Sequence, residues 1–358
     1  MTRSLSSTAG PVSDELGAAL DEHWGTDTEV FQDVPVFESM KAILARAMSR
    51  VFVGQPLCRD PKYLNAIQNF TEITASQGLA IGLLLPTFLK SIFAPLIALP
   101  YYVVARRVNK ILIPLFIQRI ADQQRAKNDV IFRQKYVEPN DLAQWMLQHG
   151  QKNEDPQEWE PARLSERMSI VVFAALHSSA IAATNVMFNL ASSPLDKGFL
   201  GSIRAEASAI MPEDISTWTN LEISKLIRAD SAIRETMRHN SIIIRGLARE
   251  VMKKEGVTLP NGLHLAQGAR LSAAIVPIHL DERFYPRAEE YNAFRFLDAR
   301  SSAQEQLEES RNPAPKTQGM SLATTGDTFY AFGRGKYVWW VSFTYILDIY
   351  SSSTNGQG

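Results

Sequence analysis

The sequence predicts a mainly α-helical fold with a small β portion. Several stretches place apolar residues three and four positions apart, which is the spacing of amphipathic helices. The middle of residues 164–193 is apolar on nearly every side, which indicates a helix buried within a large helical domain. After residue 240 the pattern changes to short segments rich in β-branched residues, which predict strands.

The predicted helices follow one another from the start of the chain to residue 239. In the second of them Phe37, Met40 and Leu44 fall on one face, and Gly54 is expected to cap its end. Polar connections are expected at 149–163 and 299–320 because neither stretch has apolar periodicity. The expected helices are 13–24, 36–53, 62–77, a helix–loop–helix within 78–105, a helical stretch over 101–136, 141–148, 164–193, 200–210 and 220–239.

Three segments after residue 240 predict the β portion. The second of them contains Pro260-Asn261-Gly262, which is typical of a turn between two short strands. The expected strand segments are 241–250, 257–265 and 270–279.

Residues 78–105 are the most apolar part of the chain. A membrane-spanning helix needs about 20 consecutive apolar residues. Here Pro86, Lys90, Pro95 and Pro100 interrupt the run, and lipid cannot replace the backbone hydrogen bonds that proline removes. We therefore expect no span, and contact with a membrane surface and burial in the core both stay open.

The composition is that of an ordinary globular protein. The chain has 358 residues, of which 45% are hydrophobic and 21% are charged, and its net charge of −1 gives no basis for a nucleic-acid partner. Cys58 is the one cysteine, which excludes an intramolecular disulfide and a thiolate-rich metal site. We expect Cys58 to be a small buried or surface thiol. Residues 1–25 lack the pattern of a secretion signal.

One charged motif lies on a predicted helix, where Glu235 and Arg238 are three residues apart and share a face. If that face is buried, the arginine has more donors than one carboxylate uses, and a second arginine would close the network. Arg295 is the candidate. A solvated surface pair is the alternative, because the same spacing also occurs at Glu160/Arg163 and Glu308/Arg311.

The order of four motifs resembles a known family. A long apolar helix with Ala174-Ala175-Leu176-His177-Ser178-Ser179 precedes the E-x-x-R motif, and Phe294-Arg295-Phe296 and Phe332-Gly333-Arg334-Gly335-Lys336 follow it. This arrangement resembles the heme-thiolate monooxygenases of the cytochrome P-450 superfamily. It is most similar to the fungal microsomal members that oxidise terpenoids and other secondary metabolites. The stretch His279-Leu280-Asp281-Glu282 agrees with that branch, and the resemblance ends at Lys336.

The resemblance implies roles for residues of the long helix. Ala174 and Ala175 would be the small residues that let heme and dioxygen approach. Ser178 would be the alcohol that relays protons during oxygen activation, and His177 would be its acid partner. On residue type alone, a histidine at position 177 is more often a core residue whose ring nitrogens are satisfied, and the resemblance makes the two interpretations about equal.

The resemblance also implies roles nearer the C-terminus. Glu235, Arg238 and Arg295 would be structural and would hold the loop that carries the iron ligand. Phe332, Gly333 and Gly335 would form the bulge whose backbone N–H groups face a cysteine thiolate, the proximal ligand of heme b.

The expected cysteine position holds a tryptophan. Counting forward from Gly335 places the ligand at Trp339, and tryptophan has only an N–H donor. Cys58 belongs to an early segment that lies far from this loop in the family's fold. Tyr337, which could be a phenolate ligand, lies two residues before the expected position. The chain is therefore expected to be inactive as given.

Two regions are expected from the resemblance: a partial P-450 domain over 1–336 and a non-homologous tail over 337–358. Lys336-Tyr337-Val338 can be encoded with GTATGT, a typical fungal intron start, so our hypothesis is that the tail is translated intron. The family's membrane anchor, first β strands and a heme-contacting helix would precede Met1.

For the family, the resemblance implies oxidation of an apolar small molecule with O2 and with electrons from NADPH–cytochrome P-450 reductase. It implies a place on the cytosolic face of the endoplasmic reticulum membrane, and without the anchor this chain would be cytoplasmic or peripherally membrane-associated. The alternatives are a non-catalytic remnant that binds hydrophobic ligands without heme and, resting on 78–105 alone, a membrane-surface helical protein.

Overall fold

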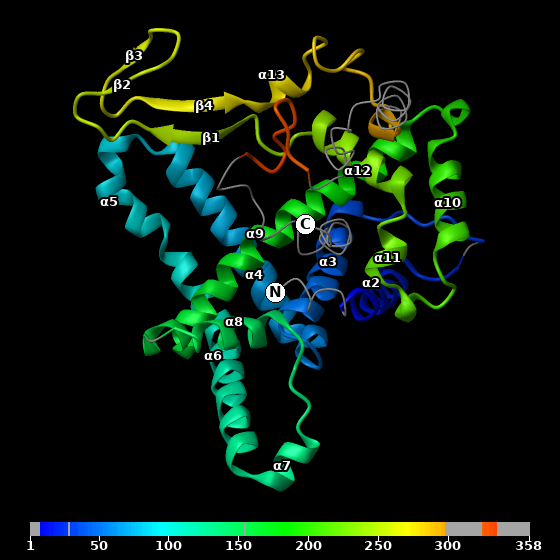
Figure 1. The fold of residues 1–358 in the computed structure, drawn as a ribbon, viewed down its shortest axis with the longest axis vertical. Helices are drawn as coiled ribbons and strands as arrows, with labels where there is room; N and C mark the ends of the chain where they lie inside the picture. The colour runs from blue at the N-terminus through cyan, green and yellow to red at the C-terminus, as the bar shows by residue number, and fades with distance from the viewer. Residues whose placement is uncertain (1–7, 28, 154, 298–323, 335–358) are drawn as a thin grey trace, which may run out of the picture. The chain divides into compact units, whose positions relative to one another are not determined.

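The computed structural model describes residues 8–27, 29–153, 155–297 and 324–334 (Figure 1). The described residues are mainly helical with two small sheets, which confirms the predicted fold class. The chain forms two compact units. Unit 1 comprises Met1–Ala180 and Pro212–Asn220, and unit 2 comprises Ile181–Met211 and Leu221–Gly358.

All the regular elements that the structure describes in unit 1 are helices. Its helices pack around buried side chains such as Ile43, Tyr63, Leu112 and Phe116. In chain order they are α2 (Ala9–Trp24), α3 (Val36–Phe52), η1 (Leu57–Arg59), α4 (Pro61–Leu79), η2 (Ala80–Leu84), α5 (Thr87–Ile97), α6 (Leu99–Asn128), α7 (Val130–Lys135), α8 (Leu142–Gly150), η3 (Pro156–Trp159), the first part of α9 (Pro161–Ser192) and η5 (Ile215–Thr217).

The end of α3 shows why its glycine is needed. The helix ends at Phe52, and Gly54 follows with a φ of +69°. A Cβ atom at Gly54 would lie 2.7 Å from an oxygen of Asp141, the residue that caps α8 by accepting a hydrogen bond from the Gln144 N–H. The predicted helix over 36–53 and its glycine cap are therefore confirmed.

The helical pattern expected over 101–136 is confirmed, and the structure divides it into two helices, α6 and α7. α6 ends at Asn128, and Asp129 has an extended backbone and caps α7 by accepting a hydrogen bond from the Phe132 N–H at 3.0 Å. The short Asp side chain competes for backbone donors in this way and starts a new helix.

Unit 2 combines helices with the two sheets. Strand β1 pairs antiparallel with β4, with an irregularity between Gly246 and Arg249, and β2 pairs antiparallel with β3. Its elements are the last part of α9, η4 (Leu195–Lys197), α10 (Phe199–Ile210), α11 (Asn220–Ile223, whose first residue belongs to unit 1), α12 (Ile227–His239), β1 (Arg245–Glu250), β2 (Val257–Thr258), β3 (His264–Leu265), β4 (Arg270–Ala274) and α13 (Ile275–His279).

Two expectations for unit 2 need correction. The helix expected over 220–239 is divided into α11 and α12. The Glu206 carboxylate accepts hydrogen bonds from the Arg228 and Ala229 N–H groups at 3.0–3.2 Å and so caps the start of α12. The strand expected over 270–279 ends at Ala274 and continues as α13. Pro277 lies in α13 and has no N–H with which to extend the β1–β4 ladder.

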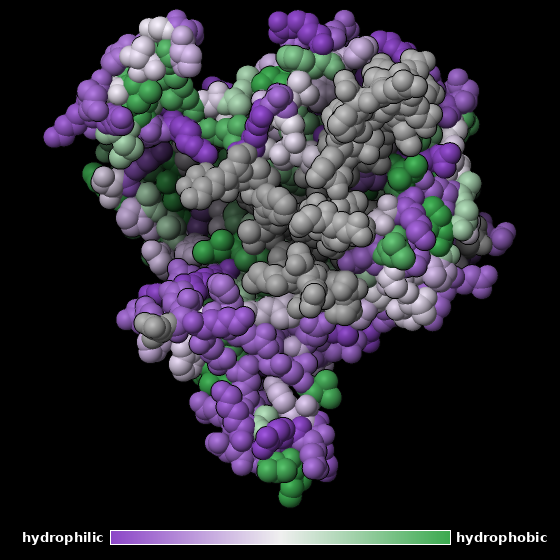
Figure 2. Space-filling view, viewed as in Figure 1, coloured by the Kyte–Doolittle hydropathy of each residue, from purple (hydrophilic) through white to green (hydrophobic). Residues whose placement is uncertain are grey.

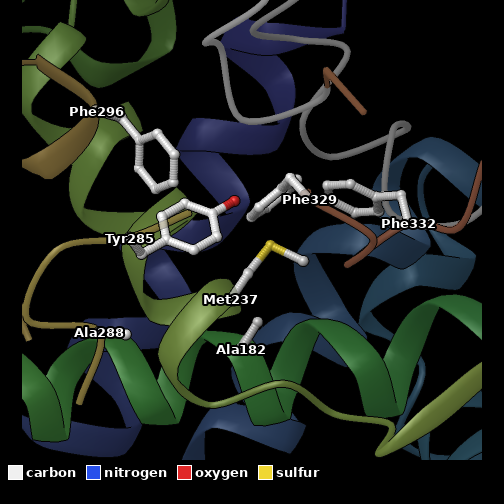
Figure 3. Packing of buried hydrophobic residues seen from close by; sticks show 7 residues of the cluster. All are labelled: Ala182, Met237, Tyr285, Ala288, Phe296, Phe329 and Phe332. Carbon is white, nitrogen blue, oxygen red and sulfur yellow. The ribbon is translucent and has the colours of Figure 1, made fainter. Parts of the chain in front are cut away.

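The core of unit 2 joins α9 and α12 to the loops that follow them. Figure 3 shows Met237 of α12 between Ala182 of α9 and a group of aromatic rings. The cluster consists of Ala182, Met237, Tyr285, Ala288, Phe296, Phe329 and Phe332. Residues far apart in sequence are thereby fixed around the last turns of α12.

Among the described residues, α9 is the one continuous helix whose length and composition would suffice to cross a membrane. Of its apolar window, 39% is buried within the structure. Phe88–Ile97 and Leu99–Asn128 pass the same test only as a pair that bends by 43°.

Candidate functional site

The residues expected to serve oxygen activation lie on α9, within unit 1. Ala175 is buried, and Ala174, His177 and Ser178 are half-buried. The Ser178 hydroxyl donates to the Ala174 carbonyl at 2.7 Å, one turn back along the helix. Its proton is therefore engaged by the helix backbone, which is the usual local partner of a serine within a helix.

His177 differs from Ser178, because its Nε2 atom is buried and has no hydrogen-bond partner among the described residues. The same is true of the hydroxyl oxygen of Ser179. A buried polar atom without a partner costs about 1–3 kcal/mol. Residue type alone favoured a core histidine with satisfied ring nitrogens, but the described contacts give Nε2 no partner.

Glu235 and Arg238 form a fully buried pair on α12. Both side chains are 0% exposed, and the guanidinium binds the carboxylate in a fork, with Nε 2.7 Å from Oε2 and Nη2 2.8 Å from Oε1. The remaining Arg238 nitrogen, Nη1, donates to the His279 carbonyl at 2.6 Å. This geometry excludes the solvated surface pair.

Arg295 supplies the second guanidinium. Its Nε donates to Glu235 Oε1 at 2.9 Å. Its two outer nitrogens donate to three backbone carbonyls, those of Pro286, Arg287 and Glu290, at 2.6, 3.1 and 2.9 Å. The structure therefore brings Glu235, Arg238 and Arg295 together, and we call these three residues the Glu235 network. Arginine suits this task because its planar fork satisfies several acceptors at once.

The segment Thr324–Arg334 contains the start of the glycine-rich motif. Phe332 is buried, and Gly333 has a φ of +77°, a left-handed conformation that favours glycine. The Gly333 N–H donates to the Tyr330 carbonyl at 2.9 Å and closes a turn. Gly335, Tyr337 and Trp339 lie outside the described residues.

Side chains that the sequence did not single out hold this segment in place. Arg234 donates to the Thr324 carbonyl at 2.7 Å, and its guanidinium lies 3.8 Å from the centre of the Phe329 ring. The Tyr285 hydroxyl donates to the Thr328 carbonyl at 3.1 Å. The Tyr330 N–H donates to the ring of His279 at 2.9 Å. His279 belongs to a stretch that supports the family resemblance, but no spacing in the sequence indicated any of these contacts.

Cys58 does not fit the role of a thiolate ligand to heme iron. It is fully buried in η1, and its sulfur lies 3.8 Å from the Glu15 carboxylate. Burial, followed by the negative charge of Glu15, raises the pKa of the Cys58 thiol to about 11, so the thiol is protonated at neutral pH. An iron-binding cysteine must be a thiolate. The cysteine of this chain therefore does not fit a heme–thiolate centre.

The described residues contain no group of three or more His, Cys, Asp or Glu side chains arranged to hold a metal ion. The arrangement in unit 2 is instead a device for positioning, in which a buried ion network ties loops to α12. Nothing in it is placed for nucleophilic or acid–base chemistry of its own.

Comparison with known proteins places this arrangement in context. The family model for cytochrome P450 matches residues 4–335. The chain is similar to cytochrome P450 monooxygenase efuH of Hormonema carpetanum, with 30% identity over 94% of this chain and 58% of that protein. It is also similar to htyF of Aspergillus rugulosus, with 29% identity over 94% and 49% of the two chains, and to pbrC of Penicillium brasilianum, with 30% over 90% and 59%.

The chain thus spans about half to three fifths of the length of the curated relatives it matches. Among solved structures it is similar to retinoic acid-bound cyanobacterial CYP120A1, with a TM-score of 0.60 and 15% identity, over 98% of this chain and 67% of that one. At that identity the likeness concerns the fold alone.

Proposed function

Because this chain belongs to the cytochrome P450 family, we propose that it is by descent a heme-dependent monooxygenase acting on an apolar secondary metabolite such as a terpenoid, and that it is inactive as this sequence stands. The proposed inactivity rests on one observation. The family's iron ligand is a cysteine thiolate, whereas position 339 is tryptophan and the chain's one cysteine is a buried, protonated thiol in unit 1.

The roles proposed for individual residues follow from this descent. Ser178 and His177 would hold and move protons at the hydroxyl and at Nε2, and Ala174 and Ala175 would leave room beside the helix. The Glu235 network would fix the loop that leads into Phe332 and Gly333. When heme is bound in this family, it supplies the oxidising chemistry, while the protein positions the substrate and the cofactor.

The whole protein's partners are part of the same proposal. Electrons would come from NADPH–cytochrome P450 reductase, and the protein would lie on the cytosolic face of the endoplasmic reticulum membrane. If the tail over 337–358 is translated intron, the spliced product would carry the cysteine, and the assignment of inactivity would apply only to the chain as given.

A test uses the full chain expressed with a heme supply. In its reduced form under carbon monoxide, we expect no red-shifted Soret band of thiolate-ligated heme. Trp339→Cys is the matched variant, and it should gain that band if Trp339 alone causes the defect. A thiolate band in the unsubstituted chain would overturn the inactivity, and a variant without the band would show that other residues also prevent ligation.

The second candidate function is retention of hydrophobic ligands without heme, and the unpartnered His177 Nε2 atom favours it. A hydroxyl or carbonyl of an apolar ligand could satisfy that atom. Equilibrium dialysis with a labelled terpenoid alcohol, using His177→Phe as the comparison, tests this. Equal binding by both proteins would remove His177 from the proposal, and no binding by either would remove the function.

Contact with a membrane surface would involve α5 and the start of α6. Phe88 and Ile92 are 79% and 64% exposed, and Leu96, Leu99 and Tyr102 are exposed beside them. Arg106 and Arg107 follow on α6 and are also exposed. Apolar side chains next to cations suit the interface of an anionic bilayer.

Flotation with vesicles of mixed neutral and anionic phospholipid tests the membrane contact. Phe88→Asp with Ile92→Asp should abolish flotation. The matched control is Val130→Asp with Ile131→Asp on α7, where Figure 2 shows hydrophobic surface at the end of the α6–α7 hairpin. Equal loss in both double variants would contradict a contact specific to α5.

A further inference from the structure

His279 connects two parts of unit 2 that are distant in sequence. It is the last residue of α13 and is fully buried. Its backbone carbonyl accepts a hydrogen bond from Arg238 of the Glu235 network at 2.6 Å, and its ring contacts Ser241, Phe329 and Tyr330. One residue therefore contacts both the buried ion network and the turn that contains the start of the glycine-rich motif.

The hydrogen bonds of the ring determine which nitrogen carries the proton. Nε2 lies 2.9 Å from the Tyr330 N–H, which is a donor, so Nε2 must accept and carry no proton. Nδ1 then carries the proton and donates to the Ser241 hydroxyl at 2.7 Å. That hydroxyl can in turn donate to the carbonyl of Met237 or Arg238, both within 3.2 Å, so every donor in the chain of bonds has an acceptor.

Charge reinforces the neutral form of this ring. Burial, followed by the positive charge of Arg238, lowers the pKa of His279 to about 4 from its ordinary value of 6.5. A neutral imidazole with one donor and one acceptor is therefore present at physiological pH. A leucine at this position would offer neither a hydrogen-bond donor nor an acceptor.

The bond from Tyr330 has a direct consequence for the glycine-rich motif. The same residue that donates to His279 accepts the Gly333 N–H at 2.9 Å, so fixing Tyr330 fixes both ends of the Tyr330–Gly333 turn. The Phe329 ring lies nearly parallel to the His279 ring, with centroids 5.4 Å apart and an interplanar angle of 18°. Hydrogen bonding and ring stacking therefore act on consecutive residues.

Other contacts to this segment are of a different kind. Arg234 reaches Thr324 and Phe329, and Tyr285 reaches Thr328 while its ring lies 5.1 Å from the Arg238 guanidinium. Both residues contact positions that precede Tyr330 in the sequence. Among the described contacts, His279 is the residue hydrogen-bonded both to the Glu235 network and to the turn itself.

We propose that His279 is a positioning residue that sets the Tyr330–Gly333 turn against the buried Glu235–Arg238 pair. This role goes beyond the proposed function and does not depend on bound heme. It requires a neutral side chain with an acceptor at the place of Nε2 and a donor at the place of Nδ1.

The test compares two substitutions by hydrogen exchange of peptides covering residues 324–334. His279→Leu removes the acceptor and should speed exchange of the Tyr330 amide roughly fivefold to tenfold, the effect of losing one hydrogen bond. His279→Gln keeps an acceptor and a donor and should restore most of the protection. His264→Leu, at an exposed histidine of β3, is the control and should leave these amides unchanged.

Wild-type exchange after His279→Leu, or a His279→Gln variant as fast as His279→Leu, would overturn the proposal. A second measurement needs no substitution and covers the case in which His279→Leu does not fold. In the histidine ¹⁵N spectrum of the wild-type chain, His279 should show a protonated Nδ1 and an unprotonated Nε2 at neutral pH. A proton on Nε2 would contradict the bond from Tyr330 and with it the proposal.

Discussion

Among the residues that the structure describes, two glutamates are completely buried, and each accepts hydrogen bonds from two arginines. In unit 1, Glu15 accepts from Arg46 at 2.8 Å, from Arg59 at 2.6 Å and from Gln55 at 3.1 Å, and we call these four residues the Glu15 network. In unit 2, Glu235 accepts from Arg238 and Arg295 at 2.7–2.9 Å. The two carboxylates have nearly the same partners.

The networks differ in the acceptors that bind the remaining N–H groups of the arginines. In unit 1, Arg46 also binds Glu22 and Arg59 lies near Asp14, and both of these acids are exposed. In unit 2, Arg238 and Arg295 donate to four backbone carbonyls, those of His279, Pro286, Arg287 and Glu290. The His279 carbonyl is buried and needs its partner, whereas the exposed carboxylates in unit 1 can be solvated instead. The other three carbonyls lie in exposed residues, and there the single Arg295 guanidinium binds three points of one loop at once.

The comparison teaches that a buried glutamate with two arginines has no fixed role. The Glu15 network joins α2 to α3 and η1, which are consecutive elements of unit 1. The Glu235 network fixes the course of the loop that follows α13, by binding the carbonyls of Pro286, Arg287 and Glu290. Its role comes from the carbonyls beyond the ion pair.

The largest expected effect follows from removing the charge of Glu235. Glu235→Gln leaves Arg238 buried without a counter-charge, and breaking a buried pair in this way costs about 3–5 kcal/mol. Native-state hydrogen exchange should report this loss in the amides of α12 and not in those of α3. An equal loss in both helices would mean that the two units do not unfold separately.

His279 should make the stability of unit 2 depend on pH. Its folded pKa of about 4 lies below the unfolded value of 6.5, so the unfolded chain binds the proton first as the pH falls. Stability is fully present above pH 6.5 and decreases toward pH 4, by about 3 kcal/mol. Urea unfolding followed by circular dichroism at pH 7 and pH 4.5 measures the decrease, which should be absent in His279→Gln.

Arg295→Lys should cost about 2 kcal/mol, because a lysine keeps the charge but cannot bind Glu235 and three carbonyls together. The matched variant in unit 1 is Arg59→Lys, whose side chain is 47% exposed and whose loss should stay below about 1 kcal/mol. Thermal unfolding of both variants gives the comparison. Similar losses would show that the carbonyl contacts add little.

Glu15→Gln should cost less than Glu235→Gln, about 1–2 kcal/mol at pH 7, because water can solvate its arginines. Burial alone would raise the pKa of Glu15, but the hydrogen bonds from Arg46, Gln55 and Arg59 outweigh it and hold the pKa below the ordinary 4.5. The stabilisation is therefore present above pH 4.5 and is lost as the pH falls through the lowered pKa. Below that pKa, the urea midpoints of the variant and the wild type should become equal. A difference in midpoint that stays constant with pH would contradict the stabilisation by the ion network.

Much of the fold could be predicted from local pattern. The helices α3, α4 and α8 and the β2–β3 hairpin follow from apolar spacing, from Asp60 and Asp141 as caps and from the Pro260–Gly262 turn. The start of α12 could not, because the carboxylate that defines it comes from Glu206, about 22 residues earlier in the chain. The end of β4 was missed because β-branched residues outweighed Pro277 in the pattern.

The candidate site could likewise be predicted only in part. The unused donors of Arg238 and the family resemblance both pointed to Arg295 as a partner of Glu235, and that contact is present. The role of the network in holding a ligand-bearing loop stays a prediction. The Glu15 network was not found, because its partners lie 31–44 residues away with no periodicity between them. The ring contacts of His279 also could not be predicted. Its partner at Tyr330 is a backbone N–H, which every residue except proline has, so the sequence does not indicate the bond.

The most direct measurement is hydrogen exchange of residues 324–334 in Glu235→Gln and Glu15→Gln, compared with the wild type under one set of conditions. If the Glu235 network positions the turn before the glycine-rich motif, exchange there should quicken at least tenfold in Glu235→Gln and stay unchanged in Glu15→Gln. Unchanged exchange in Glu235→Gln, or equal acceleration in both variants, would contradict the distinction between a network that fixes a loop and one that only joins helices.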